Sequence, residues 1–513
     1  MKKHLNLFDL SQKVNYKTEI LAGLTVAMTM IPESLMFAIL AGFPPLVGLY
    51  GAFIMGLVTA IFGGRPGLIS GGAGATVVVV MALMIRADGL EYVFAAVILA
   101  GVIQLIVGLL KLGKFIRLVP QPVMFGFVNG LAIIIFMAQM KQFEIGAGEA
   151  ATWISGTPLY TMLGLVVFTV AIIMIFPKIT KAVPASLVAI IVVFIVVYVF
   201  NIETKQVVDI ASVSGSLPPF HIPQVPFTWE TLTIIFPFGL TMAAVGLTEG
   251  LLTLNLVDEI TETKGNSNRE CLAQGSANIL NGFFYGMGGC PMIAQTLVNL
   301  SAGSRARLSG IISALTILLI ILFGAPVIER VPIAALVGVM VMVAIGTFEW
   351  ASFKALRRMP RSDIFVMILV TLITVVLHNL ALAVLIGVII SALVFAWESA
   401  KRIRARKYID EEGVKHYEIY GPLFFGSITA FNDKFDVAND PEEVIIDFEE
   451  SRVSDMSAIE ALNKLTEKYL QSGKKLHLKH LSKDCIQLLE NADKVIDVNV
   501  MEDPTYRVVV DKV

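Results

Sequence analysis

The chain has 513 residues, of which 56% are hydrophobic and only 16% are charged, and its mean hydropathy is +0.78. A soluble globule has no interior large enough for so much apolar surface, so the composition excludes a soluble protein and indicates one that spans a membrane many times. The formal net charge of −2 says nothing about partners, because the charges are segregated and the polar residues concentrate after residue 400. No nucleic-acid partner is expected.

Fourteen apolar runs of spanning or near-spanning length precede residue 400. They lie at 18–40, 44–63, 72–85, 92–110, 120–140, 158–176, 184–200, 232–256, 271–287, 291–301, 308–327, 331–347, 364–377 and 380–398. The loop at 201–231 divides them into seven and seven, and an odd number per half gives the halves opposite topology, as inverted repeats require. The first run lacks a signal-peptide cleavage site, so we expect it to remain as the first span.

The basic residues of the loops predict the orientation. With fourteen spans, both termini lie on one side, and nearly all loop lysines and arginines fall on that side. The opposite side carries only Arg86, Lys141, Lys205 and Arg330. Because cytoplasmic loops are rich in lysine and arginine, we expect both termini in the cytoplasm and the protein in the inner (plasma) membrane.

Two glycine-rich bends, at 70–76 (SGGAGAT) and 286–291 (GMGGCP), each open onto about ten apolar residues. A helix of that length covers roughly half of a ~30 Å hydrocarbon core. A half-helix that begins at membrane depth leaves its first N–H groups unpaired and directs the positive end of its dipole inward. Two such ends facing each other would form an anion site, and interrupted segments at matching positions of two halves typically mark a transporter's binding site.

After the basic stretch at 401–407 the pattern changes to alternating strands and helices. Strands are predicted at 417–425, 444–448 and 475–478, and helices at 457–472 and 485–491. This alternation predicts a small α/β domain. The segment Asp455–Ser457 before its first helix is expected to supply the helix N-cap, and the alternative is a phosphorylatable serine. The three cysteines, Cys271, Cys290 and Cys485, have neither metal-site nor disulfide spacing.

Several motifs occur in a characteristic order: IPESLMFA at 31–38, GLY at 48–50, GGRPG at 63–67, NSNRE at 266–270 and GSRARLS at 303–309. Together they resemble the sulfate permease (SulP) family of anion transporters, which includes cyanobacterial bicarbonate transporters, and the tail resembles that family's STAS domain. The resemblance implies a seven-plus-seven inverted-repeat fold with core and gate domains. It also implies a substrate held between the third and tenth elements, and a homodimer.

The expected fold is therefore a polytopic α-helical membrane protein with a small α/β STAS domain. Its expected parts are an N-terminal segment at 1–17, a transporter domain at 18–400, a basic linker at 401–416 and the STAS domain at 417–513. The two repeats of the transporter domain are expected at 18–202 and 231–400.

Glu249 lies in the middle of the eighth run, four residues before Thr253. A carboxylate at membrane depth is costly and is by default a functional candidate. The two side chains share a helix face and offer hard oxygen ligands, which suit a cation. The resemblance implies that they match the acidic residue and the hydroxyl that coordinate sodium in bicarbonate transporters. The alternative is a structural polar pair.

Glu33 follows Pro32 inside the first run, where the proline removes a helix hydrogen bond and frees polar backbone to line a cavity. The resemblance to relatives with an acid here implies a proton-coupling role, because a carboxyl group in a low-dielectric site can exchange protons near neutral pH. The alternative is that Glu33 only satisfies the broken backbone.

The predicted substrate-binding residues follow the two bends: Ala73, Gly74, Ala75, Thr76, Pro291, Met292 and Ile293. Compared with the bicarbonate transporters that the chain resembles, Ala73 replaces a threonine that contacts bicarbonate. Pro291 to Ile293 replace small residues and a threonine of the ion and substrate site. We therefore expect recognition to depend on the backbone N–H groups of Ala73, Gly74 and Met292.

The sequence predicts a secondary active transporter, not an enzyme, that carries a small anion by proton- or sodium-coupled symport and needs no cofactor. Bicarbonate, sulfate and small dicarboxylates all remain candidate substrates. Proton coupling is favoured over sodium, because the substitutions at 291–293 remove polar side chains near Glu249 and Thr253. The alternatives are an anion exchanger or channel-like conductance, a STAS-based signalling protein, and a nucleobase permease of the same fold.

Overall fold

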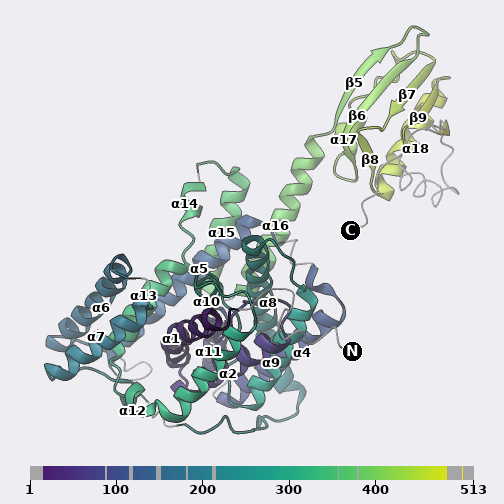
Figure 1. The fold of residues 1–513 in the computed structure, drawn as a ribbon. Coiled ribbons are helices and arrows are strands. Elements are labelled where there is room, and N and C mark those ends of the chain that lie inside the picture. Colours follow the sequence, from purple (N-terminus) through teal and green to yellow (C-terminus); the bar gives the residue numbers. More distant parts are fainter. Residues whose placement is uncertain are drawn as a thin grey trace. The chain divides into compact units, whose positions relative to one another are not determined.

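The computed structural model describes residues 15–86, 89–114, 119–145, 152–180, 183–210, 215–355, 357–377, 380–481 and 499–500. The chain divides into two compact units, with the boundary between Val388 and Ile389 (Figure 1). The helix predicted at 485–491 and most of the segment 1–17 lie outside the described residues.

Each of the fourteen predicted runs corresponds to a helix in the described part of the chain. The first half contains α1 (Tyr16–Leu40), α2 (Pro45–Phe62), α3 (Gly74–Arg86), α4 (Leu90–Leu109), α5 (Gln121–Met140), α6 (Thr157–Ile175) and α7 (Ala185–Val199). The second half contains α8 (Trp229–Thr261), α9 (Ser267–Phe283), α10 (Ile293–Ser301), α11 (Leu308–Phe323), α13 (Ile333–Thr347), α15 (Arg361–Leu377) and α16 (Leu380–Lys401). The short elements between them are β2 (Glu144–Ile145), β3 (Thr152–Trp153), α12 (Ala325–Ile328) and α14 (Ala351–Ala355).

The helices begin where the sequence offers a cap or a proline. The side chains of Asn15, Thr228 and Asn266 accept N–H bonds in the first turns of α1, α8 and α9. Pro120 and Pro184 precede α5 and α7 at the N-cap, where the missing N–H costs nothing. These local signals explain why the predicted boundaries agree with the structure to within a few residues.

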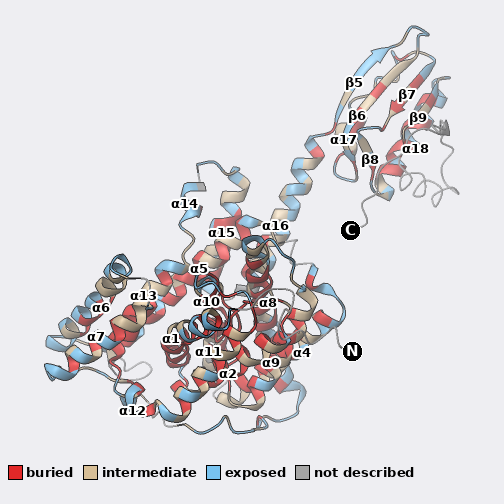
Figure 2. Ribbon diagram, viewed as in Figure 1, coloured by how far each residue is buried: buried red, intermediate tan, exposed pale blue. Residues whose placement is uncertain are grey.

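The helices of this unit pack in two groups. One group joins α1, α2, α4, α8, α9 and α11, and the other joins α5, α6, α7, α13 and α15 (Figure 1). The first group contains most of the buried side chains, and α6 and α7 are largely exposed (Figure 2). Helices α4 and α9 pack very closely, because a Cβ at Gly101 would lie 2.6 Å from the carbonyl oxygen of Gly275. The two groups agree with the expected core and gate domains.

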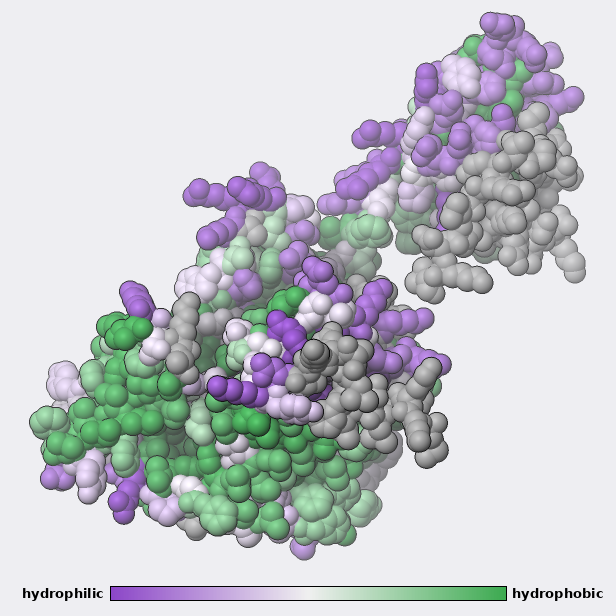
Figure 3. Space-filling view, viewed as in Figure 1, coloured by the Kyte–Doolittle hydropathy of each residue, from purple (hydrophilic) through white to green (hydrophobic). Residues whose placement is uncertain are grey.

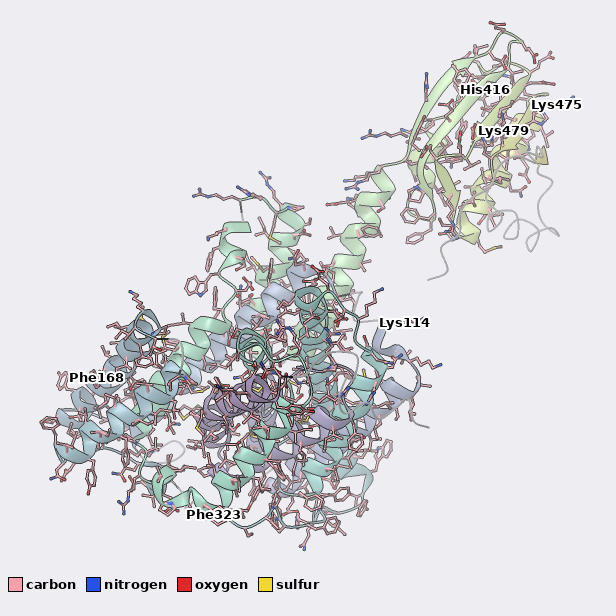
Figure 4. The ribbon with its side chains drawn as sticks, viewed as in Figure 1. Lys114, Phe168, Phe323, His416, Lys475 and Lys479 are labelled. Atoms are coloured by element: carbon pink, nitrogen blue, oxygen red, sulfur yellow. The ribbon has the colours of Figure 1, made fainter. Side chains whose placement is uncertain are left out.

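The outside of the helical unit is apolar. Large hydrophobic side chains cover it (Figure 3), and Phe168 on α6 and Phe323 on α11 are 40% and 77% exposed and point away from the unit (Figure 4). Eight of the described helices are long and apolar enough to cross a bilayer. Soluble proteins rarely expose so much contiguous apolar surface, and lipid provides its natural solvent.

The C-terminal unit is an α/β domain with a sheet in the order β10-β9-β7-β6-β5, in which β8 also pairs with β6. Only β5 is antiparallel to its neighbour. The elements are β5 (Arg404–Ile409), β6 (Lys415–Leu423), α17 (Ile428–Asn432), β7 (Glu443–Asp447), β8 (Ser451–Val453), α18 (Met456–Gln471), β9 (Lys475–Lys479) and β10 (Asn499–Val500). Asp455 caps α18 as predicted. The basic stretch at 401–416, predicted as a linker, instead contributes strand β5 and the start of β6.

A buried carboxylate organises the core of this domain. Asp440 accepts hydrogen bonds from Lys415 Nζ at 2.5 Å and from the hydroxyls of Tyr417 at 2.7 Å and Tyr469 at 2.5 Å. Burial alone would raise the pKa of Asp440, but the hydrogen bonds from Lys415, Tyr469 and Tyr417 outweigh it and hold this pKa below its ordinary value. The stabilisation is therefore present near neutral pH and is lost as the pH falls below about 4, through the folded pKa.

We expect Asp440→Ala to destabilise the domain by about 3 kcal/mol, because it leaves a lysine and two tyrosine hydroxyls without their shared acceptor. Amide hydrogen exchange of β6, β7 and β9 in the full-length protein measures this loss. Glu460→Ala is the control, because it removes an exposed ion pair with Lys464 and should leave the exchange unchanged. Equal exchange in the Asp440 variant and the wild type would contradict the prediction.

Candidate functional site

Two short strands bring the predicted half-helices together. Strand β1 (Ser70–Gly71) pairs antiparallel with β4 (Cys290–Pro291), with Ser70 opposite Pro291 and Gly71 opposite Cys290. Helix α3 begins three residues after β1, and α10 begins two residues after β4. The sequence predicts glycine-rich bends here, and the structure shows that the bends pair with each other.

Glycine is required where the strands meet. A Cβ at Gly289 would collide with the carbonyl oxygen of Gly71, so no larger residue fits between the strands. Gly288 has φ +75°, a left-handed conformation that glycine adopts without strain. In the second bend, Gly289 therefore allows the two backbones to approach each other, and Gly288 allows the backbone to adopt its left-handed conformation.

The start of α3 is buried. The carbonyl of Ala73 accepts bonds from the backbone N–H of Thr76 at 3.1 Å and from its hydroxyl at 2.8 Å. The side chains of Ala73, Ala75 and Thr76 are each at most 2% exposed. The first N–H groups of the helix have no acceptor within the helix, as at any helix N-terminus. Since the Thr76 hydroxyl is already bonded, these N–H groups are the donors that α3 can offer to an anion.

The start of α10 differs from the prediction in one donor. The N–H of Met292 donates to the carbonyl of Ile69 at 2.9 Å, so it belongs to the pairing of the two bends and is not available to an anion. None of the described side chains caps α10. Ile293 is half-buried and Ala294 is exposed, so the N–H groups that follow Met292 are the donors at this end.

Glu249 on α8 lies against β4. Its Oε2 accepts a hydrogen bond from the Cys290 thiol at 3.1 Å. The hydroxyl of Thr253 donates to the backbone carbonyl of Glu249 at 2.7 Å and not to its carboxylate. The predicted pair does share a helix face. Because the Thr253 hydroxyl donates its proton to the backbone, only the lone pairs of its oxygen remain for a cation. Glu249 is half-buried as a residue, and the thiol that donates to its carboxylate is neutral.

Glu33 reaches the same region from α1. The Nε2 of Gln295 on α10 donates to its carboxylate, and both side chains are buried. One turn earlier on α1, Met30 lies where a Cβ at Gly71 would be, and one turn later Phe37 packs against Gly74. The face of α1 that carries Glu33 therefore covers the starts of both half-helices.

Two further acids are buried, but they lie in the first turns of α1 and α9 rather than deep within the spans. Glu19 accepts the backbone N–H groups of Arg305, Ala306 and Ser309, and Glu270 accepts that of Gly64 at 2.8 Å. These bonds to backbone donors identify Glu19 and Glu270 as structural clamps at the ends of α1 and α9. Glu33 and Glu249 differ from them because, among the described residues, each is bonded by a neutral side chain and by no backbone N–H group.

Sequence reasoning missed four polar residues of the site: Gln104, Asn278, Cys290 and Gln295. The side-chain amide of Asn278 on α9 holds Gly289: its oxygen accepts the Gly289 N–H at 2.9 Å and its nitrogen donates to the Gly289 carbonyl at 3.1 Å. The same nitrogen donates to Gln104 on α4 at 2.8 Å. Polar side chains within apolar runs are costly unless they are paired, and this signal could have identified Gln104 and Asn278.

We expect Gly74→Val to weaken anion binding at least about tenfold. A Cβ at Gly74 would lie 2.8 Å from Ile135 Cδ1 and 3.1 Å from Phe37 Cζ, so a branched side chain displaces residues beside the free N–H groups of α3. Anion-dependent thermal stabilisation of the purified protein measures the affinity.

Gly164→Val on α6 is the matched control, because nothing lies within 4 Å of a Cβ at that position. The control should bind the anion as the wild type does. Wild-type affinity in the folded Gly74 variant would show that the anion binds elsewhere.

Comparison with known proteins agrees with this geometry. The sulfate permease family model matches residues 16–370, and the STAS domain model matches residues 407–507. YbaR of Bacillus subtilis, whose name assigns it provisionally to sulfate transport, is 42% identical over 487 residues, which cover 94% of this chain and 99% of YbaR.

Two solved structures share the fold. The transmembrane domain of the cyanobacterial bicarbonate transporter BicA is 29% identical with a TM-score of 0.62, covering 74% of this chain and 98% of that domain. The murine anion transporter Slc26a9 is 17% identical with a TM-score of 0.79, covering 96% of this chain and 90% of that one. With the family model spanning the helical unit and a relative matching along nearly its whole length, the chain belongs to the sulfate permease family.

Proposed function

We propose that this protein is a secondary active transporter that carries a small oxyanion into the cell together with a proton or a sodium ion. The observation that carries the proposal is the β1–β4 pair, which joins the starts of α3 and α10 in front of two carboxylates, Glu33 and Glu249. The N-termini of α3 and α10 attract the anion, and the two carboxylates offer a binding site for the cation. The family membership supports transport rather than an enzymatic reaction.

A cation is needed on energetic grounds. A cell interior that is negative by 100 mV opposes the entry of each negative charge by about 2.3 kcal/mol, so accumulation of an anion requires a co-driver. The names of the relatives suggest sulfate or bicarbonate, and the backbone donors at 73–75 and 293–295 suit any small oxyanion.

The arrangement in the membrane is part of the proposal. The excess of lysine and arginine on the N-terminal side supports a cytoplasmic location for both termini and the STAS domain, in the inner (plasma) membrane. A homodimer is proposed from the family resemblance alone. Cysteine accessibility on each side of the membrane, and the mass of the purified protein in detergent, test these two points.

Uptake of labelled sulfate, bicarbonate and dicarboxylates into proteoliposomes tests the function. Imposed proton and sodium gradients are applied separately. Accumulation above the equilibrium level with one of the two gradients supports symport. Uptake that only follows the anion gradient, or that requires a counter-anion inside, supports a channel-like conductance or an exchanger instead.

A further inference from the structure

Cys290 lies at the centre of the site but has no assigned role. Its thiol donates to Glu249 Oε2 at 3.1 Å, and its side chain is fully buried. In the same strand its backbone lies opposite Gly71 of β1. One residue therefore contacts the carboxylate on α8 and belongs to the strand pair in front of α3 and α10.

Two glycines on α8 face the strand, and one of them is required for its close approach. A Cβ at Gly246 would lie 3.6 Å from Cys290 Cβ, and a Cβ at Gly250 would lie 2.9 Å from Pro291 Cδ. Glu249 lies between these glycines in the sequence. Gly250 lets Pro291 of β4 pack on the α8 backbone, whereas a Cβ at Gly246 would make only an ordinary contact with Cys290, so the carboxylate meets the strand at the position of the thiol.

The strand is fixed on its other side. Asn278 Oδ1 accepts the N–H of Gly289 at 2.9 Å, and Asn278 Nδ2 donates to the Gly289 carbonyl at 3.1 Å and to Gln104 Oε1 at 2.8 Å. The residues Asn278, Gln104 and Gly289 are all buried. Since the residue before Cys290 is held by Asn278 of α9, which is itself bonded to Gln104 of α4, the backbone at Cys290 is fixed beside Glu249, and the thiol meets the carboxylate from that position.

We propose that Cys290 is a positioning residue that couples the charge state of Glu249 to the geometry of the two half-helices. An ionised carboxylate accepts the thiol hydrogen bond more strongly than one that is protonated or bound to a cation. Cation binding at Glu249 therefore loosens its link to β4, and with it the strand pair that orients the N–H donors for the anion. This inference rests on the proposed function, because it takes Glu249 as the cation site.

Removal of the thiol should strengthen cation binding and weaken coupling. The thiol competes with the cation for the carboxylate, so Cys290→Ala should lower the proton or sodium concentration for half-maximal uptake by about fivefold. The dependence of the anion KM on cation concentration should flatten. Cys290→Ser, which keeps a donor, should restore the wild-type behaviour. Cys290→Gly replaces the alanine variant if that variant does not fold.

Cys271→Ala is the matched control. Cys271 is a buried free cysteine on α9 in the described part of the chain, and no recorded hydrogen bond joins its thiol to Glu249. It should leave both the half-activating cation concentration and the KM dependence unchanged. A shift of equal size in the Cys271 variant would mean that the Cys290 effect is only structural and would refute the inference.

A double variant that combines Cys290→Ala with Glu249→Gln separates the proposed role of Cys290 from the proposed function of the protein. If the carboxylate is the cation site, Cys290→Ala should add nothing to Glu249→Gln when anion-dependent thermal stabilisation is measured at several cation concentrations. Wild-type coupled uptake by Glu249→Gln would overturn the proposed function itself. Loss of coupling in Glu249→Gln together with wild-type cation dependence in Cys290→Ala would overturn only the role of Cys290.

Discussion

Glu249→Gln is expected to abolish coupled anion accumulation while leaving the fold and membrane insertion intact. Glutamine has the shape of glutamate and can still accept the Cys290 thiol, but it carries no charge to hold a cation. Without the co-driver, uptake should fall to the level that the anion gradient alone supports. Accumulation in proteoliposomes, compared at equal protein incorporation, measures the effect.

Glu259→Gln is the control on the same helix. Glu259 is exposed near the end of α8, and its neutralisation should leave accumulation at the wild-type level. If the Glu249 variant still accumulates the anion against its gradient, the cation is bound elsewhere and the proposed site is wrong.

The helices could be predicted because their signals are local. The apolar runs and the glycine-rich bends before 74 and 293 can each be recognised from a few neighbouring residues. The position of Glu249 inside an apolar run was sufficient to single it out. The approximate positions of α3 and α10 therefore followed from the sequence.

The contacts of the site could not be predicted, because they join residues far apart in the chain. The residues of the Gln295–Glu33 hydrogen bond are 262 positions apart in the chain. The hydrogen bond from the Met292 N–H to the Ile69 carbonyl also joins distant residues and could not be predicted from local sequence. The sequence therefore predicted an available N–H at Met292 that the strand pairing uses. Strand β5 was missed for a related reason, since the charged residues of Arg404–Ile409 are typical of an exposed edge strand as much as of a linker.

The choice between protons and sodium depends on the ligands around the two carboxylates. Sodium requires several oxygen ligands, but Glu249 faces a thiol, and the hydroxyl of Thr253 is turned to the backbone. A proton requires only one carboxyl group that can change its charge. Gln295 suits such a group at Glu33, because its Nε2 donates to the ionised form and its buried Oε1, which has no partner among the described residues, can accept from the protonated form.

We therefore expect uptake to rise as the external pH falls, and Glu33→Gln to flatten this dependence while anion binding remains measurable. The amide keeps a hydrogen bond to Gln295 but cannot take up or release a proton near neutral pH. Uptake at a series of external pH values, with anion-dependent thermal stabilisation measured in parallel, separates transport from binding. Glu230→Gln, at the exposed start of α8, should retain the wild-type pH profile. Sodium-dependent uptake that is indifferent to an imposed pH gradient would contradict proton coupling and would return the cation to Glu249 and Thr253.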